Sequence, residues 1–247
     1  MAKIAPQGAE ATIVLGAVTN AASYAVAVAP GEIVSIFGSA LAVMPASATG
    51  PPLPAQLSDV RLWVNGMPAP LFYVSPLQLN VQIPFETAAG TARIQVSSSA
   101  GTATVDIQVA DTAPGIFTLN SQGTGPGAIE HGLSYQLVTD ANLATRGEII
   151  SIYCTGLGAV SPPALSGAAP PTPPPTPPPT PPPQTVLPVK VFIAGAPAQA
   201  TYAGLAPGFA GLYQVNVQVP AGTPLGDQNL QISVGGVTSN TVTVAIH

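Results

Sequence analysis

The sequence predicts an all-β protein of two tandem immunoglobulin-like β-sandwich domains related by internal duplication. The octapeptide "LQLNVQIP" at residues 77–84 returns as "YQVNVQVP" at 213–220, and "PGEIVSIFG" (30–38) returns as "RGEIISIYC" (146–154), in the same order. Short runs of alternating apolar and polar residues, separated by Gly, Pro, Asn and Asp, fill both copies, which is typical of sandwich strands. Repeats of this length are folded domains rather than turns of a solenoid.

The duplication divides the 247 residues into successive parts. Residues 1–15 are expected to form an N-terminal arm, and their strand-like "EATIVLG" suggests a strand that a neighbouring subunit could accept. Residues 16–110 form the first sandwich. Residues 111–145 contain "GIFTLN" and "YQLVTD", which we expect to pair as a connecting β-hairpin that packs on or between the sandwiches. Residues 146–247 form the second sandwich.

The repeated octapeptide predicts one apolar and one polar face, because successive side chains of a strand point to opposite sides. Leu77, Leu79, Val81 and Ile83 are expected in the core, as is Tyr213 with the valines that follow it. The opposite face carries Gln78, Asn80, Gln82, Gln214, Asn216 and Gln218. Two interpretations stay open for these amides. They form either an uncharged solvent face or a row that binds sugar hydroxyls or the matching face of another domain.

The proline run "PPTPPPTPPPTPPP" at residues 170–183 is expected to adopt a polyproline II conformation. The repeat alignment places it inside the second copy, as a loop insertion spanning 168–185. It is either a tolerated insertion or a stiff spacer or docking rod. Thr172, Thr176 and Thr180 lie in a context that resembles O-glycosylated stalks.

The composition favours a protein that works outside the cell. Hydrophobic residues make up 47% of the chain and charged residues only 6%, against about a quarter in typical domains, and the net charge is −5. Nucleic-acid binding needs a basic surface, and so does binding to an anionic membrane. We therefore expect no nucleic-acid partner, and a surface whose polarity comes from Ser, Thr, Asn and Gln.

No leader or membrane span is expected within the chain. The apolar stretch at residues 11–29 is interrupted by Asn20 and Ser23, and Glu10 stands where a signal peptide carries basic residues. We expect an extracellular or cell-surface location, with any leader lying outside this sequence. The single cysteine, Cys154, allows no intramolecular disulfide and is expected to be a buried core residue.

The sequence predicts no catalytic residues. Glu130, His131 and Ser134 are close in sequence, but no nucleophile-elbow motif accompanies them. Glu32 and Glu148 occupy equivalent positions of the two copies, which indicates a shared structural role at a strand start rather than an acid–base pair.

Metal and cofactor sites are not expected either. Zinc sites need clustered His, Cys or Asp residues, and this chain has no such cluster. Asp106 and Asp111 are close in sequence, but a strand position for one of them makes a calcium site weak. We expect neither a metal nor a cofactor.

Several motifs in order resemble a known family. They are "NAASY" (20–24), "APGEIVSIFG" (29–38), "PAPLFYVSPLQLNVQIP" (68–84), "APGIFT" (113–118), "RGEIISIYCTGLG" (146–158) and "YAGLAPGFAGLYQVNVQVP" (202–220). Together, over residues 16–246, they resemble the duplicated Solibacter-type C-terminal domain of secreted acidobacterial proteins. The resemblance implies export and a β-sandwich character, and it carries over no catalytic residue. This chain departs from the family in its long proline run and in carrying the domain almost alone.

The sequence favours a non-catalytic extracellular structural, assembly or adhesion protein, such as a filament or surface-layer subunit. Its expected partners are further copies of itself or other extracellular proteins. The alternative is a carbohydrate-binding module with a polysaccharide ligand. Trp63, Tyr73, Tyr202 and Tyr213 are the aromatic candidates for such a site, but Trp63 aligns with Phe192 and Tyr73 with Tyr202, which favours core positions.

Overall fold

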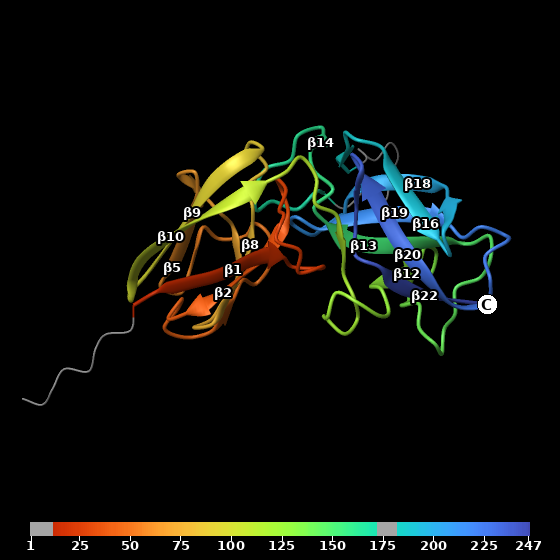
Figure 1. The fold of residues 1–247 in the computed structure, drawn as a ribbon, viewed down its shortest axis with the longest axis horizontal. Helices are drawn as coiled ribbons and strands as arrows, with labels where there is room; N and C mark the ends of the chain where they lie inside the picture. Colours follow the sequence, from red (N-terminus) through yellow and green to blue (C-terminus); the bar gives the residue numbers. More distant parts are fainter. Residues whose placement is uncertain (1–11, 172–181) are drawn as a thin grey trace, which may run out of the picture.

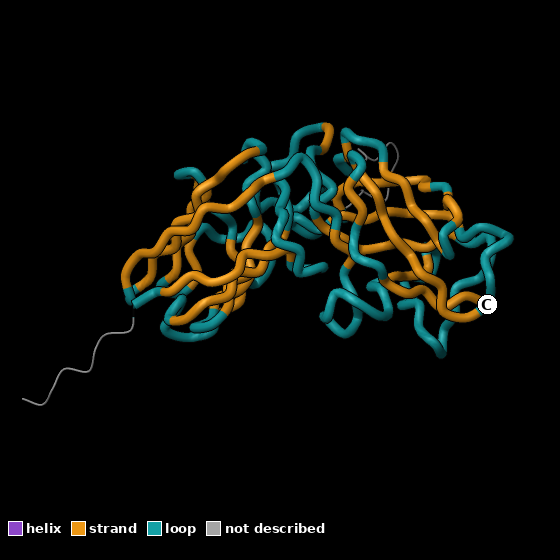
Figure 2. The backbone as a smooth tube through the Cα atoms, viewed as in Figure 1, coloured by secondary structure: helices purple, strands orange, loops and turns teal. Residues whose placement is uncertain are grey.

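The computed structural model describes residues 12–171 and 182–247. Within these residues the chain forms two β-sandwiches side by side, with loops gathered where they meet (Figure 1, Figure 2). The predicted tandem of immunoglobulin-like sandwiches is confirmed. No helix in the described part is long and apolar enough to cross a membrane. Thr172, Thr176 and Thr180 lie outside the described residues, as do residues 1–11 of the expected arm.

The first sandwich packs two antiparallel sheets around an apolar core. Its strands are β1 (Val14–Asn20), β2 (Ile33–Ser39), β3 (Ala46–Ser47), β4 (Gln56–Leu57), β5 (Val60–Val64), β6 (Met67–Pro68), β7 (Leu71–Val74), β8 (Gln78–Gln82), β9 (Gly90–Ser98) and β10 (Gly101–Val109). The sheets have the orders β1-β2-β8-β7-β3 and β10-β9-β5-β4, with β6 paired to β5. In β9, buried Ala92, Ile94 and Val96 alternate with exposed residues, so this strand turns one face to the core.

The second sandwich repeats this plan around a separate core. Its strands are β11 (Gly115–Ile116), β12 (Ile129–His131), β13 (Ile149–Thr155), β14 (Val160–Ser161), β15 (Gln184–Thr185), β16 (Val189–Ile193), β17 (Ala196–Ala198), β18 (Ala200–Leu205), β19 (Tyr213–Gln218), β20 (Gly226–Val234), β21 (Val237–Thr238) and β22 (Val242–Ile246). One sheet has the order β11-β13-β19-β18-β15-β14, with β12 on β13. The other has the order β17-β16-β20-β21, with β22 on β20. The proline run connects β14 to β15.

The expected arm and connecting hairpin differ in the structure. Strand β1 begins at Val14 and pairs with β2, and Ile13 already belongs to the first core, so the first sandwich starts inside the expected arm. The two expected hairpin strands do not pair with each other. Instead, β11 and β12 each pair with β13, and Ile116 and Ile129 enter the second core. The apolar side chains of this segment are buried best by extending the second sandwich.

The two copies of the octapeptide start differently. The core position expected for Tyr213 is confirmed, since this residue is fully buried and its hydroxyl donates to the Gly158 carbonyl. The core position expected for Leu77 is wrong, because its side chain is 65% exposed. Strand β8 begins one residue later, and the Ser75 hydroxyl accepts the Gln78 N–H in a turn that directs Leu77 to solvent.

The two sandwiches are joined by buried hydrogen bonds. Thr155 Oγ1 of β13 accepts the Ile33 N–H of β2 at 2.9 Å and donates to the Gly211 carbonyl at 3.1 Å. Asn20 Nδ2 at the end of β1 donates to the Ala113 carbonyl at 2.9 Å. Because buried polar groups are costly to leave unpaired, these bonds hold the two domains in one arrangement.

A second set of contacts closes the junction on its other side. Phe85, from the loop after β8, packs against the core of the second sandwich. Its N–H donates to Ser166 Oγ at 2.9 Å, and Ser166 Oγ donates to Glu86 Oε2 at 2.8 Å. The tandem is therefore a single rigid unit rather than two domains on a flexible tether.

Candidate functional site

Both sandwiches carry the same ladder of polar side chains on the outer face of one sheet. In the first, Asn80 Oδ1 accepts from Ser35 Oγ at 3.1 Å and from Gln78 Nε2 at 2.8 Å. The predicted polar face is therefore real for these two amides, although both are half-buried rather than solvated. Asn80 Nδ2 and Gln78 Oε1 make no hydrogen bond to the described residues.

The second ladder reproduces the first almost atom for atom. Asn216 Oδ1 accepts from Ser151 Oγ at 3.0 Å and from Gln214 Nε2 at 2.8 Å. Because the same bonds return in both copies, the serine on the neighbouring strand explains why the asparagine stands in the middle of each octapeptide. The ladder positions one free amide group of each asparagine on the sheet surface.

The third amide of each octapeptide has different surroundings in the two copies. Gln82 is fully buried at the domain junction, where Nε2 donates to the Gly31 carbonyl at 3.2 Å and Oε1 accepts the Gly167 N–H at 2.7 Å. Its counterpart Gln218 is exposed, and its Nε2 donates to the Gly147 carbonyl at 2.9 Å. Gln82 therefore contacts the second domain of the same chain, which is one of the two expectations for these amides, and it is not available to a further ligand on this face.

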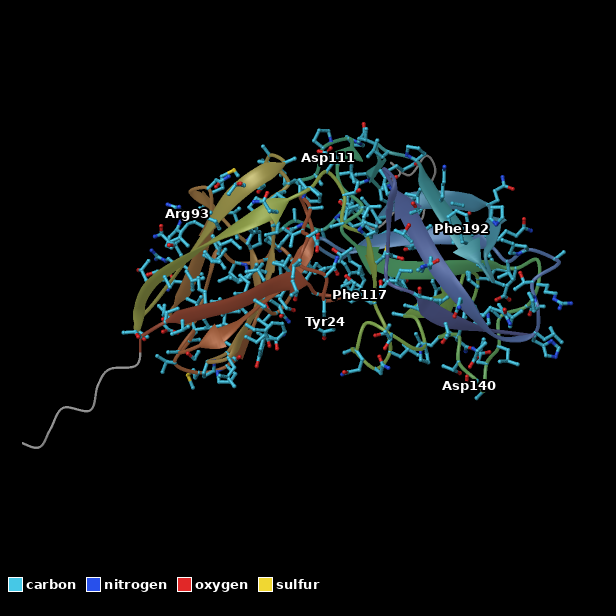
Figure 3. The ribbon with its side chains drawn as sticks, in the orientation of Figure 1. Tyr24, Arg93, Asp111, Phe117, Asp140 and Phe192 are labelled. Atoms are coloured by element: carbon cyan, nitrogen blue, oxygen red, sulfur yellow. The ribbon has the colours of Figure 1, made fainter. Side chains whose placement is uncertain are left out.

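A cleft of about 360 Å³ lies over the first ladder, between the sheet and the start of the second domain. We define the first cleft by Ser35, Asn80, Phe72, Tyr24 and Phe117. Figure 3 shows Tyr24 and Phe117 together at the junction of the two domains. Both aromatic residues come from loops, and Phe72 comes from β7. None of the three was singled out from the sequence, because nothing in the strand pattern marks an exposed loop aromatic.

The second ladder lies under a different cleft, of about 520 Å³. We define the second cleft by His131, Glu148, Thr201 and Asn216. Here His131 Nδ1 lies 2.9 Å from Glu148 Oε1, and no aromatic side chain lines the space. Thr201 occupies the position that Phe72 has in the first copy. Of the second ladder only Asn216 lines this cleft, so the two clefts share the central asparagine of the ladder and differ in the residues around it.

The residues Glu130, His131 and Ser134 do not form a triad. Glu130 Oε2 accepts from the Tyr153 hydroxyl at 2.8 Å, and His131 turns to Glu148 instead. Ser134 lines the second cleft but makes no hydrogen bond to His131 among the described residues. The arrangement provides a hydrogen-bonded His131–Glu148 pair and no activated nucleophile.

The equivalent glutamates have diverged. Glu32 is fully buried at the domain junction, where burial raises the pKa of its carboxyl group well above the usual value. Its Oε2 accepts the Ala29 N–H, whereas Oε1 has no partner among the described residues. A carboxyl group with a raised pKa keeps its proton to a higher pH than an exposed glutamate does. The shared structural role at the strand start is kept by the backbone, because each glutamate N–H donates to the carbonyl three residues earlier and each glutamate carbonyl accepts the N–H of Ile83 or Val219. Only the side chains of Glu32 and Glu148 differ in their surroundings.

The candidate metal ligands and the single cysteine have surroundings in the described part of the chain that favour neither metal binding nor thiol chemistry. No cluster of three or more His, Cys, Asp or Glu side chains occurs there. Asp106, a weak calcium candidate, is paired with Arg93 at 2.8 Å across β9 and β10. Cys154 is fully buried, as expected, and burial strongly raises the pKa of its thiol.

The two sandwiches also differ at a sheet edge. In the second, the outer edge of β22 is covered. The Thr243 N–H donates to the Gly125 carbonyl and the Thr243 carbonyl accepts the Gly127 N–H, while the Ala245 carbonyl accepts the Ala144 N–H. In the first, the equivalent edge strand β10 is bonded on this side only at its end, where the Ala110 N–H donates to the Val28 carbonyl at 2.8 Å. We call residues 101–108 the open edge, since no described strand pairs with them on that side.

Comparison with known proteins adds little to this geometry. No family model matches the chain, and no curated protein matches it. A solved structure of SGBP-B from a Bacteroides ovatus mixed-linkage glucan utilization locus, in complex with a heptasaccharide, is 14% identical, with a TM-score of 0.32. The alignment covers 89% of this chain and 43% of that one, so the chain spans less than half of that protein.

Two tandem proteins are also similar. Domains 5–6 of the S-layer protein SbsC are 14% identical over 95% of this chain and 98% of that one, with a TM-score of 0.28. A titin Ig tandem is 12% identical over 90% and 91%, with a TM-score of 0.23. Because every one of these TM-scores is below 0.5, none of these likenesses carries an argument about function.

Proposed function

We propose that this chain is a non-catalytic extracellular structural or adhesion protein whose copies associate through the open edge of β10. The open edge carries the proposal. A long strand with unpaired backbone groups accepts a strand from another chain, and soluble monomers usually block such edges. The low charge of the chain and its resemblance to domains of secreted proteins support an extracellular setting.

The occupant that fits the open edge best is β10 of a second copy. Strand alternation places the N–H groups of residues 102, 104, 106 and 108 on the same side as that of Ala110, away from β9. Two such edges related by a two-fold axis offer each other matching donors and acceptors. The rigid junction then fixes the direction in which the second domains extend. A contact to a different surface would instead give a filament.

The substitution Thr104→Pro tests this assembly. Because the Thr104 N–H points away from β9, proline removes no hydrogen bond within the domain but blocks an incoming strand. We expect light scattering to give about twice the 24.5 kDa chain mass for the wild type and the chain mass for T104P, with similar melting temperatures. A monomeric wild type, or a T104P variant that associates as well as the wild type, would contradict the proposal.

A carbohydrate-binding role is the second candidate, and one observation favours it. The first cleft combines aromatic rings with free amide groups. The aromatic candidates from the sequence, Trp63, Tyr73 and Tyr202, line neither of the two clefts. An adhesive protein would use such a cleft to hold a glycan of a surface or matrix.

A further inference from the structure

Tyr24 is held in an unusual conformation at the edge of the first cleft. Its backbone has a φ of 62°, which is rare for a bulky residue and recurs at functional positions. Its hydroxyl donates to the Ser121 carbonyl at 2.8 Å, across to the second domain. Yet the residue remains 41% exposed. The fold therefore fixes this ring without burying it, which is the arrangement expected of a stacking platform.

The floor of the first cleft presents a donor beside an acceptor. Asn80 Oδ1 is occupied by Ser35 and Gln78, so the free group of Asn80 is its Nδ2 donor. Gln78 uses its Nε2 in the same ladder, so its free group is the Oε1 acceptor. Neighbouring hydroxyls of a sugar ring are both donors and acceptors and suit such a pair. The ladder keeps both side chains in place before a ligand arrives.

The charge and size of the first cleft restrict its ligand. No charged side chain lines it, in contrast to the second cleft with His131 and Glu148. Its volume of about 360 Å³ falls in the range of small-molecule pockets. Beyond Phe72 and Ile33 a second apolar cavity of about 280 Å³ continues toward Phe209, which is 57% exposed. The surface therefore extends past one sugar unit.

We infer that the first cleft binds a neutral polysaccharide, with the apolar face of a sugar ring on Tyr24 or Phe117 and its hydroxyl edge on Asn80 and Gln78. Aromatic rings provide apolar contact area and the amides provide orientation. The chain would continue over Phe72 toward Phe209. The inference rests on the proposed adhesive function and names its ligand class.

Affinity electrophoresis in gels containing laminarin, mixed-linkage β-glucan, xylan, glucomannan or dextran tests the inference, with polygalacturonate as the charged comparison. We expect retardation by at least one neutral polymer and none by polygalacturonate. Titration calorimetry with hexasaccharides of the retarding polymer then gives an affinity. We expect Tyr24→Ala and Asn80→Ala to weaken it at least 10-fold, and Tyr24→Phe, which keeps the ring, to change it less than 3-fold.

Asn216→Ala is the matched control. It breaks the same ladder in the second copy, so its effect on folding resembles that of N80A, but it lies under the cleft without aromatics. The N216A variant should bind the hexasaccharide with the same affinity as the wild type. No retardation by any of the neutral polymers, or equal weakening by N80A and N216A, would overturn the inference. A T104P monomer that still binds the glycan would show that glycan binding and assembly are separate.

Discussion

The two clefts show how a duplicated scaffold acquires different surfaces. Both stand on the same ladder, with Asn80 bonded to Ser35 in one copy and Asn216 bonded to Ser151 in the other. Phenylalanine and tyrosine rings line the first cleft, and the hydrogen-bonded side chains of His131 and Glu148 line the second. Tyr24 and Phe117 come from a loop and from the segment between the copies, whereas Phe72 comes from β7, where the second copy has Thr201. The two copies therefore keep the central asparagine and differ in the residues around it.

The neighbouring domain accounts for a further difference. Residues of the first copy that face the second domain are buried, and their counterparts in the second copy are not: Gln82 is fully buried and Gln218 is exposed. Glu32 is buried as well, whereas the Glu148 side chain is 26% exposed. Equivalent residues of the two copies therefore lie in different surroundings. Substituting both members of an equivalent pair measures how much that difference contributes to the free energy of unfolding.

The largest contrast is expected at the first residue of the octapeptide. Tyr213→Ala empties a fully buried position and should lower the free energy of unfolding by about 3–5 kcal/mol, the range for large buried aromatics. Leu77→Ala removes a side chain that is 65% exposed and should change it by less than about 0.5 kcal/mol. Urea unfolding followed by circular dichroism measures both. Equal effects would mean that the two strands begin alike.

The third amide should give the next largest contrast. Gln82→Ala leaves the buried Gly31 carbonyl and Gly167 N–H without partners, so we expect a loss of about 2–3 kcal/mol. Gln218→Ala removes one exposed bond to Gly147 and should cost less than about 0.5 kcal/mol. The same urea titration compares them. A Q82A variant as stable as Q218A would show that the junction does not depend on this side chain.

Much of the fold could be predicted from the sequence, since the period-two pattern and the repeat both act within single strands. Leu79 and Val81 are buried as the alternation requires, and Tyr213 is buried as well. Leu77 could not be predicted, because its exposure depends on a turn held by the Ser75 side chain. The burial of Gln82 depends on contact with a second domain, which no strand pattern encodes.

The candidate site was predictable only in its floor. Gln78, Asn80, Gln214 and Asn216 were identified because they repeat at a fixed spacing. The aromatic wall was not, because Tyr24 and Phe117 are distant in sequence and meet only when the two domains dock. The sequence predicts a hairpin for the segment between the copies, whereas this segment pairs with β13, and that pairing brings Phe117 to the cleft.

Glu32 should make the free energy of unfolding depend on pH. Its folded-state pKa lies above its unfolded value, so its contribution is fully present below about pH 4.5 and is lost as pH rises through the folded-state pKa. The slope is at most about 1.4 kcal/mol per pH unit. Glu32→Gln mimics the protonated carboxyl, so the decline should disappear.

Urea unfolding at steps between pH 5 and 9 measures this slope. We expect E32Q to gain stability relative to the wild type as pH rises, whereas Glu148→Gln should leave the decline in place because Glu32 is unchanged. An E32Q variant that loses stability equally at every pH would show that the carboxyl is needed in its charged form. That result would contradict the expectation that the buried Glu32 carboxyl group is protonated in the folded protein.

The smallest contrast is expected between two side-chain pairs, His131–Glu148 in the second cleft and Arg93–Asp106 on the surface of the first sandwich. The side chains of His131 and Glu148 are 14% and 26% exposed, so His131→Ala should cost roughly 1 kcal/mol and loosen β12 from β13. Arg93 and Asp106 are 65% and 50% exposed, and Arg93→Ala should leave the melting temperature unchanged, since exposed pairs contribute little.

Amide hydrogen exchange locates the effect of His131→Ala, which should appear as faster exchange confined to residues 129–138. The contrary outcome is that R93A accelerates amide exchange in β10 as much as H131A does in β12. That result would show that the exposed Arg93–Asp106 pair stabilises the open edge, and it would contradict the expected difference between the surfaces of the two domains.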